Sequence, residues 1–297
     1  MSHLSYSVDN PAAVAREWTW AIRGRVLMLG PRTLVMGVVN ATPDSFSDGG
    51  RTLSPQAAVE HGLRLVAEGA DLLDVGGEST RPGSAPVPAA QELERVLPVI
   101  RALARACDVP ISVDTTKAEV AVAAIDAGAR IVNDVSGLRG DPELARRIAA
   151  SGAGLIVTHM QGTPATMQAA PAYADLIAEV LAGLAASLGA AGAAGIAPER
   201  VVVDPGIGFG KSVRHNLTLL AHAGDFCALG RPVLIGASRK SFLGSVTGRA
   251  VGDRLAGSIA AAAIAIGAGA AIVRVHDVAP TLDAARLVDA VRAGGAR

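Results

Sequence analysis

Polar side chains follow the short apolar runs of this sequence, and they are of types that bind or transform small molecules. In order along the chain they are Asn40, Asp74, Asp114, Asn133, His159, Asp204, Ser238 to Lys240, and Arg274 with His276. A single Asp or Asn in such a place is most simply a cap or turn residue. Because the pattern recurs after every run, it predicts one polar, concave site instead, in which carboxylates accept N–H donors and cations bind anions.

The elements that must position these residues have a repeating context. A helical stretch ends in a Gly-Ala pair, and a short apolar run follows at once, as at 69–75 and 128–134. Gly ends a helix at low cost in the left-handed region, and continuous apolar strands are typical of parallel sheets covered on both faces. The runs cover residues 34–40, 72–75, 111–114, 131–134, 155–159, 201–204, 233–236 and 272–276.

Eight strands in strict alternation with eight helices predict an α/β fold, a (β/α)8 TIM barrel, in preference to a doubly wound sheet. Ser54 before Pro55 predicts one helix start, and residues 116–119 fit a capping box. Residues 25–29 with Gly30 and Pro31 predict a β-hairpin that closes the barrel bottom. We expect residues 1–23 to be a loosely ordered N-terminal extension and residues 24–297 to form a single barrel domain.

Composition narrows the class of protein. Half of the 297 residues are hydrophobic, and 27 Lys and Arg balance 27 Asp and Glu. This neutrality argues against a nucleic-acid or membrane-surface role. The two cysteines lack metal-binding spacing, and residues 1–10 lack the apolar core of a signal peptide, so a cytoplasmic protein is expected. The uncharged stretch 255–273 is interpreted as a buried helix and strand, not as a membrane span.

Two long loops, residues 41–50 and 76–84, follow the first two runs and predict lids over a site. Lysine occurs only at positions 117, 211 and 240, and Lys240 is a candidate site residue because it follows the seventh run. Residues 206–212 nearly match a phosphate-binding P-loop, but Pro205 stands where its first Gly is required. A nucleoside triphosphatase is therefore rejected.

Taken together in order, the motifs resemble those of the dihydropteroate synthases from about Gly24 onward. The segments that carry the resemblance are residues 38–50, 74–83, 112–115, 133–137, 159–164, 204–206, 238–241 and 274–277. Ala41 stands where Val is usual in the family. The resemblance implies condensation of (7,8-dihydropterin-6-yl)methyl diphosphate with 4-aminobenzoate, giving 7,8-dihydropteroate and diphosphate in folate biosynthesis.

The resemblance also implies residue roles. The pterin would contact Asp114, Asn133, Asp204, Lys240, Met160 and Phe209. The diphosphate would contact Asn40, Thr80, Arg274 and His276. Mg2+ would be the cofactor, with Asn40 as its protein ligand. This ligand choice agrees with the preference of Mg2+ for oxygen ligands that include substrate phosphates.

By the same resemblance, 4-aminobenzoate would be framed by Phe46, Thr80, Arg81, Pro82 and Ser241. The reaction would be a dissociative substitution at the pterin methylene, with Asp44 and Asp48 stabilising the cation while Lys240, Arg274 and His276 complete the catalytic set. Because residues 80–82 keep the family's sulfonamide-sensitive pattern, sulfonamides are expected to compete with 4-aminobenzoate.

Two alternatives remain open at this point. A pterin-dependent methyltransferase domain would keep the pterin carboxylates but would have little reason to keep the first loop or the pair of Arg274 and His276. A non-catalytic pterin-binding paralogue would keep the whole site, since an intact site can be unused. The resemblance implies small-molecule substrates and a homodimer formed through the late helices.

Overall fold

Eight parallel strands form one barrel-like sheet in this computed structural model, which describes residues 16–42, 54–81 and 83–294. The strands are β3 (Leu34–Asn40), β4 (Leu72–Gly76), β5 (Ile111–Asp114), β6 (Ile131–Asp134), β7 (Gly154–Thr158), β8 (Val201–Asp204), β9 (Leu234–Ile235) and β10 (Ile272–Val275). They lie in the order β8-β7-β6-β5-β4-β3-β10-β9. One parallel bridge between Val203 and Val233 joins β8 to β9, so the sheet nearly closes and the expected (β/α)8 barrel is confirmed.

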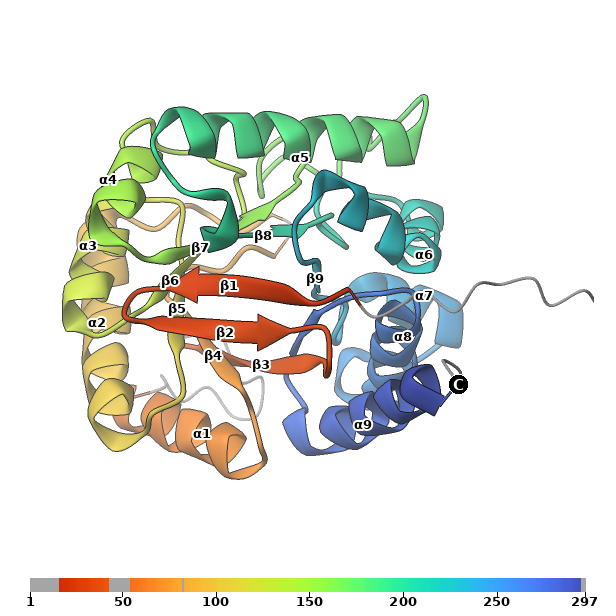
Figure 1. The fold of residues 1–297 in the computed structure, drawn as a ribbon, viewed down its shortest axis with the longest axis horizontal. Helices are drawn as coiled ribbons and strands as arrows, with labels where there is room; N and C mark the ends of the chain where they lie inside the picture. The colour runs from red at the N-terminus through yellow and green to blue at the C-terminus, as the bar shows by residue number, and fades with distance from the viewer. Residues whose placement is uncertain (1–15, 43–53, 82, 295–297) are drawn as a thin grey trace, which may run out of the picture.

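Helices surround this sheet (Figure 1). They are α1 (Pro55–Ala67), α2 (Ala89–Ala106), α3 (Ala118–Ala127), α4 (Leu144–Ser151), α5 (Leu176–Ala193), α6 (Val213–Ala221), α7 (Ser241–Thr247), α8 (Leu255–Gly267) and α9 (Val278–Gly294). The predicted strict alternation of strands and helices is wrong at one connection, because both α7 and α8 lie between β9 and β10. Gly248, with a φ of 71°, ends α7 in the left-handed region and lets the chain turn into α8.

The starts of α1 and α3 test the two capping predictions. Ser54 accepts a hydrogen bond from the Ala57 N–H at 3.3 Å and caps α1, as expected. The capping box at 116–119 is wrong. The first N–H of α3, from Ala118, instead donates to Asp141 of the next βα loop at 2.8 Å. That cap depends on tertiary packing and has no signal within the helix itself.

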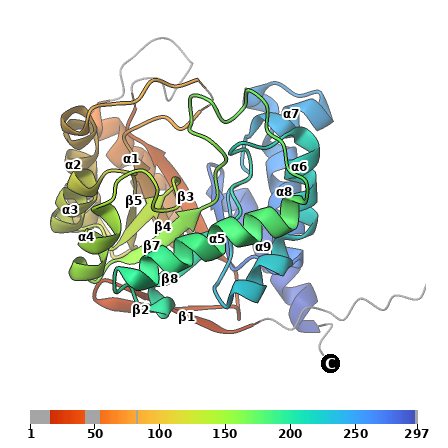
Figure 2. The same ribbon diagram turned by 90° about the horizontal axis from the view of Figure 1, so that it is seen from above.

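An antiparallel hairpin of β1 (Trp18–Ile22) and β2 (Arg25–Leu29) covers one end of the barrel (Figure 2), as expected. Trp20 of β1 is fully buried, and its Nε1 donates to the Arg200 carbonyl at 3.0 Å. At Gly154 a Cβ would lie 2.7 Å from the Ile22 side chain, so the hairpin packs directly on the start of β7. The boundary expected after residue 23 is placed too late, because β1 belongs to the closing hairpin.

The core has two layers. The barrel interior beneath the hairpin is filled by apolar side chains from alternate strand positions, including Leu34, Met36, Leu72, Ile131, Ile156, Val202 and Ile272. The other strand residues pack against the helices in a second, larger layer. The residues that close the strands on the far side from the hairpin therefore have no apolar layer above them, and they form the floor of a site.

The uncharged stretch 255–273 divides into helix α8 and the start of β10, which confirms that prediction. Among the described residues, one helix, α5, is long and apolar enough to span a membrane by length and composition alone.

Candidate active site

A buried polar cluster lies at the carboxyl ends of four strands. The Nε of Arg274 on β10 lies 2.6 Å from Asp74 on β4, and its Nη2 lies 3.0 Å from Asp114 on β5. Asn133 on β6 donates to the same Asp74 oxygen at 3.0 Å. The other oxygen of Asp74 is buried and has no hydrogen-bond partner within the described part of the chain. Asp74 was not assigned a role from sequence, although its place after a strand marked it.

The buried charged groups of this cluster shift one another's pKa values. Burial, together with the nearby Asp74, raises the pKa of Asp114, while Arg274 opposes the rise. Burial disfavours the charged form of Arg274, but the two carboxylates outweigh it and raise its pKa. One buried guanidinium therefore faces two carboxylates, which leaves carboxylate oxygens for a further N–H donor from a ligand.

A second group lies beside it, at the ends of β8 and β9. Asp204 is almost fully buried and accepts the Gly206 N–H at 2.7 Å. The Nζ of Lys240 lies 4.3 Å from the centre of the Phe209 ring and also donates to the Ile207 carbonyl. Burial lowers the pKa of Lys240 to about 8, although Asp204 opposes this shift. The structure thus brings together Asp204, Lys240 and Phe209, three of the residues to which the family resemblance gave a role.

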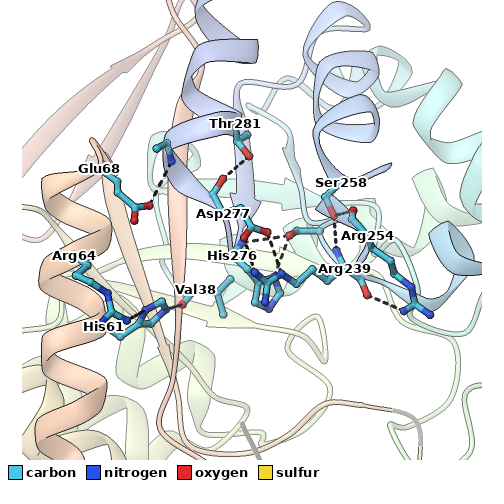
Figure 3. Close-up of polar contacts among 12 residues, drawn as sticks. Val38, His61, Arg64, Glu68, Arg239, Arg254, Ser258, His276, Asp277 and Thr281 are labelled. Carbon is cyan, nitrogen blue, oxygen red and sulfur yellow. Dashed lines mark hydrogen bonds and ion pairs between the residues drawn. The ribbon is translucent and has the colours of Figure 1, made fainter. Parts of the chain in front are cut away.

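Arg239, between Ser238 and Lys240, has a left-handed backbone with a φ of 59°, which is uncommon for a residue with a side chain. Three contacts hold it there (Figure 3). Its N–H donates to Ser258 at 3.0 Å, its Nε donates to Asp277 at 3.0 Å, and its carbonyl accepts from Arg254 at 3.1 Å. Because of this conformation, Arg239 binds Asp277 while Lys240 reaches Phe209.

His276 lies on the same side of the site, after β10. Its Nδ1 lies 3.0 Å from the Ser238 hydroxyl, and its backbone N–H donates to that hydroxyl at 3.2 Å. Burial, followed by the positive charges of Arg274 and Arg239, lowers the pKa of His276 to about 3. The imidazole is therefore neutral near pH 7 and suits hydrogen bonding better than charge pairing.

A cavity of about 560 Å³ opens beside Asp114 and reaches the loop that follows β4. Thr80 and Met160 line it, as expected for site residues. Lys117 and Arg139 also line it, and the sequence analysis gave neither of them a role. The only sequence signal for Lys117 was the scarcity of lysine, and that signal was too weak to use.

Lys117 joins the two loops beside this cavity. Its ammonium pairs with Glu78, which lies two residues before Thr80, and with Glu92 of α2 at 2.5 Å. Glu92 is fully buried, and Glu78 also accepts the Val87 N–H at 3.2 Å. The strand end that carries Asp114 is thereby tied to the loop that carries Thr80.

The remaining predicted residues are dispersed around the rim. Asn40 closes β3 and is partly exposed, and Ser241 is exposed at the start of α7. Arg81 is exposed, but it is close enough to lower the pKa of His276. Four predicted residues lie outside the described part of the chain, namely Asp44, Phe46, Asp48 and Pro82.

Comparison with known proteins identifies the family to which this chain belongs. A profile described as "Pterin binding enzyme" matches residues 36–276. The dihydropteroate synthase of Escherichia coli (strain K12) is 46% identical over 256 residues, which is 86% of this chain and 90% of that protein. The chain belongs to the dihydropteroate synthase family. Members of this family are transferases, so an enzyme is the expected class, and the recognition made from motifs is confirmed.

Solved dihydropteroate synthases share the whole fold. The Yersinia pestis enzyme in a sulfonamide drug complex matches with a TM-score of 0.88 at 43% identity, covering 93% of this chain and 99% of that one. The Burkholderia cenocepacia dihydropteroate synthase, solved with 7,8-dihydropteroate, matches with a TM-score of 0.84 at 45% identity, covering 94% and 98%. A dihydropteroate synthase of Mycobacterium leprae (strain TN) is 47% identical over 263 residues.

Proposed function

We propose that this chain condenses (7,8-dihydropterin-6-yl)methyl diphosphate with 4-aminobenzoate and releases diphosphate. The observation that carries the proposal is the convergence of Asp114, Asn133, Asp204 and Lys240 on one buried floor at the carboxyl ends of the strands. Family membership and the relative solved with 7,8-dihydropteroate support the same reaction. The convergence matters because these side chains come from four different strands or loops. Together they offer hydrogen-bond donors and acceptors to one polar edge of a ligand.

The floor suits a pterin. A 2-amino-4-oxo ring edge presents N–H donors beside a carbonyl acceptor, and carboxylates form strong, charge-assisted bonds with such donors. Asp204 and Asn133 would bind the aminopyrimidine edge, and Asp114 would bind an N–H of the other ring. The buried Asp74 oxygen, which accepts no hydrogen bond from any described residue, supports a further N–H contact there. Lys240 would donate to the ring oxygen, while Met160 and Phe209 bound the ring faces.

The diphosphate would lie at the rim beside Asn40, Thr80, Arg274 and His276. Arginine suits phosphate oxygens because its guanidinium offers a fork of donors. Among the described residues no three His, Cys, Asp or Glu side chains gather to hold a metal. A rim amide such as Asn40, completed by substrate oxygens and water, fits Mg2+ under that constraint. When bound, Mg2+ would neutralise charge on the departing diphosphate.

At the methylene carbon the C–O bond would break and its electron pair would leave with the diphosphate. A C–N bond would form to the neutral arylamine, whose nitrogen then releases one proton to the solvent. Thr80, Arg81, Phe46, Pro82 and Ser241 would hold 4-aminobenzoate, and Asp44 and Asp48 would stabilise positive charge on the pterin methylene. Because the attacking amine is neutral, no strong base is required. Lys240 would orient the ring so that the carbon faces the amine.

The test is release of diphosphate from the pterin substrate with Mg2+, with and without 4-aminobenzoate, for the wild type and Lys240→Ala. Release that requires 4-aminobenzoate and falls at least about 100-fold in the variant is expected, since a positioned donor is lost. Arg214→Ala on the exposed start of α6 is the matched control and should keep full activity. Pterin binding without release would instead favour the binding paralogue or the methyltransferase alternative.

Mg2+ has its own test. Removing divalent cations should abolish release, and Asn40→Ala should raise the Mg2+ concentration needed for half-maximal rate. Calorimetric titration of Mg2+ into the protein with bound diphosphate gives a readout independent of turnover. Unchanged Mg2+ affinity in Asn40→Ala would contradict the assigned ligand.

We further propose a cytoplasmic homodimer that associates through its late helices. Large apolar side chains are exposed there, among them Val246 at 56% on α7, Ile264 at 54% on α8 and Leu287 at 67% on α9. Exposed apolar side chains on neighbouring helices favour an interaction surface there. Sedimentation velocity of the wild type beside Ile264→Glu should show a dimer converted to a monomer.

A further inference from the structure

Lys211 belongs to the glycine-rich segment 206–212 that nearly matches a phosphate-binding loop, yet its side chain turns into the protein and is 2% exposed. Its Nζ lies 2.9 Å from the Phe209 carbonyl, 3.3 Å from the His159 carbonyl and 3.1 Å from the His159 Nδ1. An ammonium has three donors and no acceptor, so these three acceptors use all of them. The lysine has no donor left for a ligand phosphate.

The three acceptors come from two different loops. His159 follows β7 and immediately precedes Met160, whereas Phe209 lies between the end of β8 and helix α6. Both loops border the proposed pterin pocket, with Met160 on one side and Phe209 on the other. Lys211 is therefore a strap between the two sides of that pocket.

Backbone packing shows that the two loops are in close contact. A Cβ on Gly206 would lie 1.9 Å from the His159 carbonyl oxygen, and one on Gly210 would lie 2.6 Å from the Gln161 carbonyl oxygen. Both glycines have a positive φ, which side chains rarely adopt. Tyr173 adds a further link, because its hydroxyl donates to the Gly210 carbonyl at 2.9 Å.

The positive charge of Lys211 also affects the pKa of Asp204. Burial raises the pKa of Asp204, and the positive charges of Lys240 and Lys211 act against that rise. Burial lowers the pKa of Lys211 to about 7, and Asp204 opposes this shift. The titratable and charged groups that face Lys211 are Asp204, Lys240, Arg139, His159, Tyr173 and His215.

When Lys211 is charged, the Nδ1 of His159 is the acceptor of their contact, because an ammonium can only donate. Burial and then the charge of Lys211 lower its pKa to about 3, so the ring is neutral near pH 7. With its Nδ1 accepting from Lys211, the ring proton is assigned to Nε2. Its position after β7 suggested from sequence a residue of the site rim, but its ring instead faces Lys211.

We propose that Lys211 is a positioning residue for the pterin half of the site, which fastens the Met160 loop to the Phe209 loop and places a positive charge beside Asp204. The inference rests on the proposed pterin function. It predicts that loss of Lys211 weakens pterin binding while leaving the 4-aminobenzoate side of the cavity unchanged.

The experiment compares Lys211→Met, Lys211→Gln and the wild type, with Arg214→Met as a control that removes a nearby exposed charge. Methionine removes both strap and charge. Glutamine is shorter but keeps two N–H donors for the two carbonyls, and it removes the charge and the donor to the His159 Nδ1. Each variant is checked by urea unfolding, and the dissociation constant for dihydropterin diphosphate is measured by calorimetry across a pH series, beside the KM for 4-aminobenzoate.

For Lys211→Met the dissociation constant should rise at least about tenfold, as expected for lost hydrogen bonds to a charged group. Its KM for 4-aminobenzoate should stay within about twofold of the wild type, since that side makes no contact with Lys211. In both variants the pH below which pterin binding is lost should move upward by at least about half a unit, because Asp204 has lost a counter-charge. Lys211→Gln should show a smaller loss of affinity than Lys211→Met.

Unchanged pterin affinity in folded Lys211→Met, an equal rise in both substrate constants, or an unmoved acid limit would each overturn the inference. If Lys211→Met does not fold, the acid limit of Lys211→Gln decides the matter in the same way. A wild type that binds the pterin but releases no diphosphate would count against the proposed reaction alone. The binding comparison would still decide the role of Lys211.

Discussion

The guanidinium of Arg274 lies 2.6 Å from the carboxylate of Asp74, a residue 200 positions earlier in the chain. The same side chain reaches Asp114 at 3.0 Å. The arginine that would bind the diphosphate is thus held by a carboxylate that would bind the pterin. A single cation therefore links the two proposed halves of one substrate, and its loss should affect stability and catalysis together.

Arg274→Met tests this link. At about pH 8 the change leaves Asp74 and Asp114 buried without their cation, and breaking a buried pair costs about 3–5 kcal/mol. Urea unfolding should show that loss, and diphosphate release should fall at least about 100-fold because a charge at the leaving group is gone. The exposed Arg286→Met, 71% accessible in its side chain, should change stability by less than about 0.5 kcal/mol. Wild-type stability in Arg274→Met would contradict the pairing.

Asp114→Asn should raise stability while it weakens function. The pKa of Asp114 is higher in the folded protein, about 7, than its ordinary 3.8, so folding is favoured when Asp114 is protonated and loses stability as pH rises through that window. The variant escapes this loss and should gain roughly 2 kcal/mol at pH 8 but little at pH 4. Its pterin affinity should fall, because an amide offers an N–H where a carboxylate accepted one. A gain confined to low pH would contradict the raised pKa.

Lys117→Met should weaken 4-aminobenzoate binding more than pterin binding. The change releases Glu78, and with it the loop that carries Thr80, and leaves Glu92 buried without its cation. Steady-state kinetics should show the KM for 4-aminobenzoate rising several-fold, at about constant pterin affinity.

The double variant Lys117→Met with Glu92→Gln removes the unpaired buried charge. It should recover most of the lost stability, but not the KM for 4-aminobenzoate, because the tie to Glu78 stays broken. Recovery of both quantities together would show that the effect was one of stability alone.

Deleting residues 1–23 should destabilise the barrel. Deleting residues 1–15 leaves the whole hairpin in place and should not have this effect. The longer deletion removes β1 and with it Trp20, whose truncation to Ala alone should cost about 3–5 kcal/mol. Thermal unfolding of both deletions and of Trp20→Ala provides the comparison. The activity per folded Trp20→Ala molecule should match the wild type, since the hairpin lies at the end opposite the site (Figure 2).

A sulfonamide should inhibit competitively with 4-aminobenzoate, in line with the relative solved in a sulfonamide drug complex. The two compounds share an arylamine and an acidic group, so both should occupy the space beside Thr80. Initial rates at several concentrations of each should give a changed KM for 4-aminobenzoate and an unchanged maximal rate. A rate that stays constant at high sulfonamide and low 4-aminobenzoate would contradict this prediction.

The sequence by itself determined the strand order along the chain and the rim of the site. Apolar runs of four to seven residues, each closed by a polar residue and several of them introduced by a helix end, are local signals, and β3 and β8 end at the polar residues Asn40 and Asp204 as expected. In parallel strands the carboxyl ends meet on one side, so local signals are enough to gather Asp114, Asn133 and Asp204. The motif resemblance then assigned roles that spacing alone does not carry.

Only the tertiary structure decided which of these groups touch one another. The pairing of Arg274 with Asp74, the strap from Lys211 to His159 and the cap of Asp141 on Ala118 join residues from different βα units. Such contacts depend on distances across the barrel and on burial, which sets each pKa through desolvation. A local sequence pattern encodes neither the distances across the barrel nor the burial of a side chain. For that reason the near-match to a P-loop gave no indication that Lys211 is buried.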